Sequence, residues 1–341
     1  KIRENVVEEF PPAVLAEAAS IPQRVAAADK VGREDLRDLD LCTIDPADAR
    51  DHDDALFIER IKGGFHVVVA IADVSHYVRL GTAIDDEAQA RCTSIYLPDR
   101  VIPMLPHEIS SNLASLVPKK DRLCLAVDIT LDATGRVTHH RYIEGIMRST
   151  AKLTYEGVAD ALGLTTEGGV KQAAARERVP MLQALLDLSR ILRQRRLERD
   201  ALDFDLPEPR VKLDEQGEPI DVVRSRQDPG VREAYRVVEE MMLLANETVA
   251  GYLERHVAIA GALVVDATAV DFFGAPALAA LHRVDRCCAA IGVNWRLVDR
   301  LGESVHLCVL QANQVLTVLT EAPQHAFRAS GWVGRSFPAY C

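Results

Sequence analysis

Aspartates are dense in the stretch TIDPADARDHDDAL, which runs from Thr43 to Leu56. Like charges this close repel one another and raise one another's pKa, so the stretch makes physical sense if a cation lies among the carboxylates. Carboxylate oxygens are hard ligands that suit Mg²⁺ or Mn²⁺, and Mg²⁺ usually completes its shell with water and substrate phosphate. The aspartates are Asp45, Asp48, Asp51, Asp53 and Asp54, with Arg50 as the basic residue among them.

An acidic loop exposed to water is the alternative interpretation of this stretch, because runs of like charge are often simply solvated. A calcium-binding EF-hand is excluded, since that loop requires Gly at its sixth position and Glu at its twelfth. Counted from Asp45, those positions hold Arg50 and Leu56.

The spacing of Asp45, Asp51, Asp53 and Asp54 closely resembles the metal-binding signature of the ribonuclease II/ribonuclease R family of exoribonucleases. The resemblance continues through VVVAIADVSHYV, TSIYLPDRVIPMLPHEISSNLASLVP, STAKLTYEGV and VEEMMLLANETVA, in the same order along the chain. It implies a Mg²⁺-dependent enzyme, with Mn²⁺ as a second possible metal. The implied reaction is hydrolysis of single-stranded RNA from its 3′ end, which releases nucleoside monophosphates; DNA and membranes are not expected partners.

The same resemblance assigns roles to the four aspartates. It implies that all four hold the metal ions and that Asp53 and Asp54 act in catalysis, with Asp54 the more important. In a two-metal arrangement, the ions activate the attacking water and stabilise the leaving oxygen.

Tyr96, Tyr155 and Glu239 are the RNA-binding residues that the resemblance implies. Tyr96 lies in the proline-rich stretch YLPDRVIPMLP, which must be an ordered, irregular loop. Stacking on an aromatic ring is tolerant of base sequence, as a non-specific exoribonuclease requires. For each tyrosine, a packed core aromatic is the alternative. Glu239 shares a helix face with Asn246, which we expect to be the buried face, and the adjacent Glu240 is the alternative RNA contact.

The elements around these residues define an α/β fold class, with a catalytic domain of mixed sheets and long helices. Asp73, at the end of a buried strand, is expected either to be satisfied locally or to point into a site. Alternating and continuous apolar runs predict strands, and apolar residues at helical spacing predict helices. Helices are expected over 13–19, 85–91, 152–162, 172–200 and 231–256. Strands are expected over 55–61 and 65–74, joined by a hairpin at Gly63-Gly64, with the second a buried central strand. Further hairpins are expected over 123–146, turning at residues 132–135, and about residues 216–217.

Composition and cysteine usage favour a cytoplasmic location. Its net charge of −11 argues mildly against an RNA partner, although phosphate contacts are local and a basic patch can override it. The seven cysteines form no CxxC pair, which fits a reducing compartment better than disulfides or zinc. No apolar run approaches the length of a membrane span. Arginines between Arg190 and Arg199 could contact phosphate or be solvated.

The pattern changes after His256. A strand at 263–266, a helix at 275–291, a strand at 293–298, a helix at 304–312 and a strand at 315–319 resemble a partial anti-sigma-factor-antagonist (STAS) fold, a small βαβαβ unit. Its phosphorylatable serine is replaced by Gly274-Ala275-Pro276, so only a protein-binding role is expected. The expected domains are a linker over 1–40, the front part of a catalytic domain over 41–256, the STAS-like segment over 258–322 and an irregular tail over 323–341.

Two expectations about activity follow from this organisation. The family segment whose arginine contacts the reacting phosphate is not recognisable after His256, so the chain is expected to degrade RNA at least ~100-fold more slowly than a full-length relative. The alternative function is a non-catalytic interaction protein with a degenerate nuclease half. The intact aspartates favour the enzyme.

Overall fold

The computed structural model describes residues 7–165, 169–199, 201, 209–214, 216–224 and 228–260, and then five later strands. The chain forms two compact units, residues 1–249 and residues 250–341. The first unit holds every predicted site residue.

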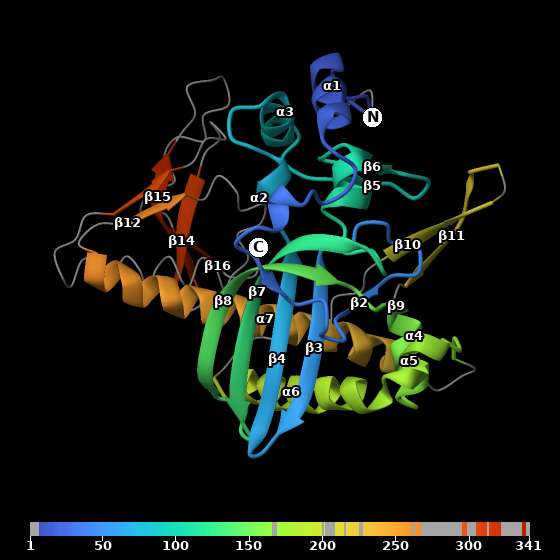
Figure 1. Cartoon of the computed structure of the whole chain (residues 1–341), viewed down its shortest axis with the longest axis vertical. Helices are drawn as coiled ribbons and strands as arrows, with labels where there is room; N and C mark the ends of the chain where they lie inside the picture. The colour runs from blue at the N-terminus through green and yellow to red at the C-terminus, as the bar shows by residue number, and fades with distance from the viewer. Residues whose placement is uncertain are drawn as a thin grey trace. The chain divides into compact units, whose positions relative to one another are not determined.

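A seven-stranded mixed sheet is the centre of the first unit (Figure 1). The two edge strands run parallel to their neighbours, and all other adjacent pairs are antiparallel. In spatial order the strands are β1 (Glu34–Asp35), β8 (Val137–Arg148), β7 (Asp121–Asp132), β4 (Gly64–Ala72), β3 (Asp54–Ile61), β2 (Cys42–Asp45) and β9 (Ala151–Thr154).

The side chains of strand β4 show that the sheet is buried on both faces. Val67 and Val69 pack into the core on one face, whereas Val68 and Ala70 pack into the core on the other. Successive side chains of a strand point to opposite faces, so a strand covered on both sides must be apolar throughout. The predicted buried central strand is confirmed.

The hairpins of the sheet turn where glycine allows a left-handed backbone. Gly63 has φ +87° between β3 and β4, and Gly135 has φ +73° between β7 and β8. Residues with a Cβ rarely adopt such angles, so these glycines fix the two turns. Both hairpins were predicted, as was the separate pair β10 (Pro209–Leu213) and β11 (Pro219–Arg224).

Three helices cover one face of the sheet: α4 (Tyr155–Ala161), α6 (Val179–Leu197) and α7 (Pro229–Ala260). Figure 1 shows α6 and α7 running alongside one another across the strands. The single helix predicted over 172–200 is wrong. Arg178 interrupts it, so that α5 (Ala173–Glu177) ends before α6 begins, with Pro180 in the first turn of α6, where proline is tolerated.

The start predicted for the helix over 152–162 is also wrong. Residues 151–154 form β9 instead, because they add a parallel edge strand to β2. Thr154 ends that strand and caps α4, since its hydroxyl accepts a hydrogen bond from the Gly157 N–H at 3.0 Å.

The opposite face of the sheet is covered by α1 (Pro12–Ser20), α2 (Val74–Tyr77), α3 (Ala83–Arg91) and the single-turn π-helix η2 (Ile109–Leu113). The predicted helices over 13–19 and 85–91 are confirmed, with α3 beginning two residues earlier than expected. Its cap is Thr82, whose hydroxyl accepts from the Asp85 N–H at 3.3 Å. The proline-rich loop contributes the short antiparallel pair β5 (Ile95–Tyr96) and β6 (Val101–Ile102).

The second unit agrees only in part with its prediction. Strands β12 (Leu263–Asp266) and β13 (Trp295–Val298) pair in parallel as a βαβ connection requires, while the helix predicted over 275–291 lies outside the described residues. The helix predicted over 304–312 is wrong. Val305–Gln311 is strand β14, because its alternating residues pair antiparallel with β15 (Gln314–Glu321). Strand β16 (Ser336–Pro338) adds to β15 within the expected irregular tail.

No helix among the described residues is long and apolar enough to cross a membrane. Of the cysteines whose side chains are described, Cys42 and Cys124 are buried and Cys92 is exposed.

Candidate functional site

Two adjacent strands bring the acidic stretch to one end of the sheet. Strand β2 ends at Asp45, and its antiparallel neighbour β3 begins at Asp54. The residues between them form an irregular connection, which starts at Pro46, a residue that cannot donate to the sheet. The ends of the acidic stretch are therefore anchored in regular structure, while its middle forms a loop.

The carboxylates at this end of the sheet are electrostatically coupled. Burial of Asp54, together with the nearby negative charges of Asp45 and Asp53, raises the pKa of Asp54 to about 7, and the neighbouring His52 opposes this shift only in part. Burial and nearby negative charges both disfavour the ionised carboxylate, and a positive ion among these groups would offset both effects. The arrangement fits a cation.

Contacts from two other strands hold the loop in place. The Lys152 ammonium of β9 donates to the carbonyl oxygens of Ala47 at 3.4 Å and Ala49 at 2.7 Å. The Asp53 carbonyl accepts from the Ala72 N–H of β4 at 2.9 Å. The role of Lys152, the second residue of β9, was not predicted from the sequence.

Tyr96 lies directly beside this loop. Its hydroxyl donates to the Asp51 carboxylate at 3.1 Å, and burial of the hydroxyl end together with the Asp51 charge raises the pKa of Tyr96 to about 12. The residue as a whole is 68% exposed. An aromatic ring this accessible is available for stacking, which a packed core tyrosine is not.

The predicted four-aspartate ligand set stays a prediction. In the part of the chain that the structure describes, no three His, Cys, Asp or Glu side chains converge in a ligand arrangement. Asp45, Asp53 and Asp54 are close enough to influence one another, whereas Asp51 bonds to Tyr96 and Asp48 is exposed on the loop.

Tyr155, the first residue of α4, lies at the same end of the sheet as the acidic loop. It follows Thr154, which is the register partner of Asp45 in the parallel pair of β9 and β2. Its ring is 9% exposed and stacks on Tyr235 of α7, with ring centroids 3.5 Å apart and planes at 16°. This is the environment of the core alternative, and the RNA contact of Tyr155 stays a prediction.

Glu239 and Glu240, which are adjacent in α7, differ sharply in exposure. Glu240 is 2% exposed and forms a salt bridge of 2.5 Å with Arg196, whereas Glu239 is exposed. The expectation that Glu239 and Asn246 face the core is wrong: both are exposed, because helical spacing directs Val238, Met241 and Ala245 inward instead. Glu239 thus remains accessible to a ligand.

Asp73 is satisfied locally. It caps α2, accepting from the His76 N–H at 3.1 Å and from the Ser75 hydroxyl at 2.8 Å, and it accepts from the Arg33 guanidinium at 2.5 Å. Of the two predicted alternatives, the structure selects the local one.

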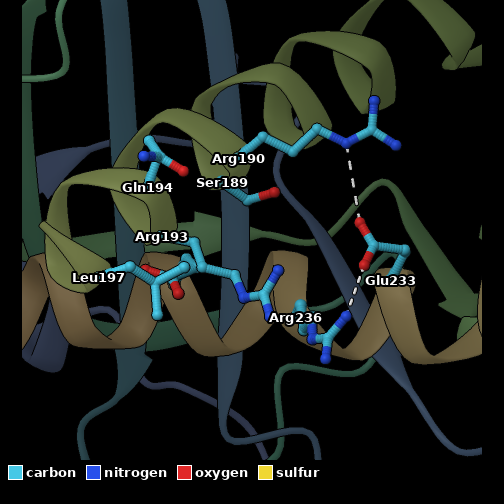
Figure 2. A pocket seen from close by; sticks show the side chains of 8 residues that line it. Ser189, Arg190, Arg193, Gln194, Leu197, Glu233 and Arg236 are labelled. Atoms are coloured by element: carbon cyan, nitrogen blue, oxygen red, sulfur yellow. Dashed lines mark hydrogen bonds and ion pairs between the residues drawn. The ribbon is translucent and has the colours of Figure 1, made fainter. Parts of the chain in front are cut away.

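A cavity of about 220 Å³ lies between α6 and α7 and is rich in arginine (Figure 2). Figure 2 shows Glu233 between Arg190 and Arg236, which approach it at 3.7 and 2.7 Å. Two further arginines of α6 also have partners within the chain: Arg196 pairs with Glu240, and Arg195 donates to the Gly135 carbonyl. Just after α6, Arg199 pairs with Glu247 at 3.3 Å. These contacts account structurally for Arg190, Arg195, Arg196 and Arg199, and none of the acidic-loop residues lines this cavity.

Comparison with known proteins identifies the family. A family model described as the RNB domain matches residues 33–270, which is more than half of the chain. The chain belongs to the RNB domain family. The match extends 14 residues past the expected end of the catalytic part at residue 256.

Curated relatives agree with this assignment. Ribonuclease R of Thermotoga maritima is 42% identical over 247 residues, which cover 71% of this chain and 33% of the relative. Ribonuclease R of Escherichia coli is 38% identical over 247 residues, covering 72% of this chain and 30% of the relative. The chain therefore spans about a third of the length of these relatives.

Solved structures share the fold. Mycoplasma genitalium RNase R in complex with ribose-methylated single-stranded RNA has a TM-score of 0.66 and 31% identity, over 74% of this chain and 38% of that one. The same enzyme with double-stranded RNA has a TM-score of 0.68 and 30% identity, over 75% of this chain and 44% of that one. Yeast Ssd1, a pseudonuclease, shares the fold with a TM-score of 0.51 at 19% identity, over 67% of this chain and 27% of that one. The fold by itself does not decide whether a chain is catalytic.

Proposed function

We propose that this chain is a 3′-to-5′ exoribonuclease domain that hydrolyses single-stranded RNA to nucleoside 5′-monophosphates in the cytoplasm. The observation that carries the proposal is the position of Asp54. Its carboxyl group lies at the start of β3 beside Asp45 and Asp53, and the exposed ring of Tyr96 lies against the same loop. A place for a cation and a stacking surface for a base are thereby brought together.

The residues present fit Mg²⁺ or Mn²⁺. The donor set consists of hard carboxylate oxygens, and burial together with the negative charges of Asp45 and Asp53 raises the pKa of Asp54, an effect that a bound cation would oppose. Asp45, Asp51, Asp53 and Asp54 would hold the metal. When bound, it would polarise the phosphodiester and lower the pKa of water.

The bond changes of the proposed reaction are simple. Water attacks the last phosphodiester phosphorus, the bond from phosphorus to the 3′ oxygen breaks, and that oxygen receives a proton. The products are a nucleoside 5′-monophosphate and an RNA shorter by one nucleotide. The aspartates place the phosphate, while Tyr96, Tyr155 and Glu239 orient the terminal nucleotide. Base stacking on Tyr96 would be worth ~1–3 kcal/mol whatever the base.

The relatives support RNA as the substrate. Proteins named ribonuclease R are about 40% identical over most of this chain, and the M. genitalium enzyme has been solved with bound RNA. A protein-binding role for the STAS-like segment stays a second, weaker prediction, since β14 replaces a helix that the STAS resemblance requires.

A degradation assay tests the proposal. The purified chain is incubated with 5′-labelled oligo(A) and Mg²⁺, and product lengths and released nucleotide are followed over time. Stepwise shortening with release of AMP is expected, and Asp54→Asn should slow it by at least ~10²-fold. Asp48→Asn, in the same loop but outside the proposed ligand set, is the matched control. RNA binding without any shortening would favour the non-catalytic alternative.

A further inference from the structure

His52 is a buried imidazole inside the acidic loop, with aspartates on either side of it in the sequence. Its side chain is 4% exposed. Its Nδ1 lies 2.7 Å from Oδ2 of Asp45. An ionised carboxylate can only accept hydrogen bonds, so Nδ1 carries the proton in this pair. The ring thus donates to the residue that ends β2.

Hydrogen bonds to the segment just after η2 hold the backbone of His52 in place. The His52 N–H donates to the Ser115 hydroxyl at 2.9 Å, and that hydroxyl donates to the Arg50 carbonyl at 3.0 Å. The Leu116 N–H donates to the His52 carbonyl at 2.8 Å. Ser115 and Leu116 are themselves fully buried. The position of the ring is therefore set by the core of the domain, not by the loop alone.

We propose that His52 is a positioning residue, which holds the Asp45 carboxylate in one orientation for a divalent cation. The inference rests on the proposed function, because it requires the acidic loop to bind metal. One oxygen of Asp45 is engaged by the imidazole, so rotation of the carboxylate is restrained before any cation arrives. Groups that orient a ligand in this way typically change metal affinity by ~10–100-fold when they are removed.

A second histidine in the same sheet offers a matched control. His66 of β4 also bonds to carboxylates, with Nδ1 at 2.9 Å from Glu59 and Nε2 at 2.8 Å from Asp128. Glu59 lies toward the opposite end of β3 from Asp54. Substitution of His66 therefore removes a comparable histidine–carboxylate pair without touching the acidic loop.

The test is a Mn²⁺ titration by calorimetry, without RNA, on the parent, His52→Phe, His52→Asn and His66→Phe. His52→Phe keeps a ring but loses the donor, and its Mn²⁺ affinity is expected to fall ~10–100-fold. His52→Asn places an amide donor near the position of Nδ1 and should recover most of the affinity. His66→Phe should bind as the parent does. Melting temperatures in chelator identify any loss that comes from unfolding.

The outcomes separate the two proposals. Parent-like Mn²⁺ affinity in a folded His52→Phe overturns the positioning role and leaves the proposed function standing. Absence of Mn²⁺ binding by the parent overturns the metal-dependent function and this inference with it. Should His52→Phe fail to fold, Ser115→Ala is the second variant, because it removes the hydroxyl that accepts from the His52 N–H and keeps every carboxylate. Ser115→Ala must then lower the Mn²⁺ affinity, and unchanged affinity overturns the inference.

Discussion

The Tyr96 hydroxyl donates a hydrogen bond of 3.1 Å to the Asp51 carboxylate, so an exposed aromatic ring is tied to the acidic loop. The bond fixes the hydroxyl end of the side chain and leaves the ring accessible. If the proposed function is right, this hydrogen bond links the stacking residue Tyr96 directly to the proposed metal ligand Asp51.

Removal of the Tyr96 ring should weaken RNA binding at any base composition. Tyr96→Ala is expected to lose ~1–3 kcal/mol of binding free energy for oligo(A) and oligo(U) alike, because stacking is tolerant of sequence. Tyr96→Phe, which keeps the ring but not the bond to Asp51, should bind nearly as the parent does. Fluorescence anisotropy in Ca²⁺, chosen to keep the RNA intact, measures both. Equal affinities for Tyr96→Ala and the parent would assign Tyr96 to structure.

The acidic loop should bind divalent cations before RNA is present. A ligand that binds only the folded state stabilises it by ~2.7 kcal/mol at a concentration 100 times its dissociation constant. Mg²⁺ or Mn²⁺ should therefore raise the melting temperature of the parent, and Asp53→Asn should abolish that increase. Asp48→Asn should retain it. A melting shift that persists in Asp53→Asn would place the cation elsewhere.

Substitutions of Glu239 and Glu240 should have different effects, the first on RNA binding and the second on stability. Glu240→Gln removes the charge that pairs with Arg196, whose side chain is 22% exposed, so the weakened charged contact should cost ~1–3 kcal/mol of unfolding free energy. Glu239→Gln, on the exposed side of α7, should leave the melting temperature unchanged and weaken oligo(A) binding. Chemical denaturation and anisotropy measure the two effects. Weaker RNA binding by a folded Glu240→Gln, with none by Glu239→Gln, would reverse the assignment.

The strands and the acidic loop could be predicted because their signals are local. Alternation, glycine turns and the aspartate spacing all lie within short stretches, and the Gly63 and Gly135 turns are where the sequence places them. The side-chain partners could not be predicted. The stack of Tyr155 on Tyr235 joins residues eighty positions apart, and the bond from His52 to Asp45 depends on a clamp at Ser115.

Helix limits failed where tertiary pairing overrode local preference. Lys152 has a helix-compatible sequence around it, yet β9 forms because β2 offers an open edge with which it can pair. The segment 305–311 forms a strand instead of the predicted helix because it pairs antiparallel with β15. Glu239 of α7 is exposed because the apolar residues Val238, Met241 and Ala245 determine which face of the helix is buried.

The capping carboxylate Asp73 should make the first unit sensitive to acid. Burial disfavours the charge of Asp73, but hydrogen bonds from Ser75 and Arg33, with the positive charge of Arg33, outweigh burial and hold the pKa of Asp73 below its ordinary value of 3.8. A carboxyl group whose folded-state pKa is depressed contributes stability above its unfolded pKa. That contribution is lost as the pH falls through the folded-state value.

Asp73→Asn should therefore be less stable than the parent at pH 7, and the difference should shrink as the pH falls below about 4, where the parent loses the same charge. Urea denaturation of both proteins between pH 7 and pH 3 measures the difference. Glu108→Gln, a substitution at an exposed residue just before η2, is the control and should be as stable as the parent at pH 7. A difference between Asp73→Asn and the parent that stays constant across this range would show that the ionised form of Asp73 is not what stabilises the start of α2, and that the contact with Arg33 acts through packing alone.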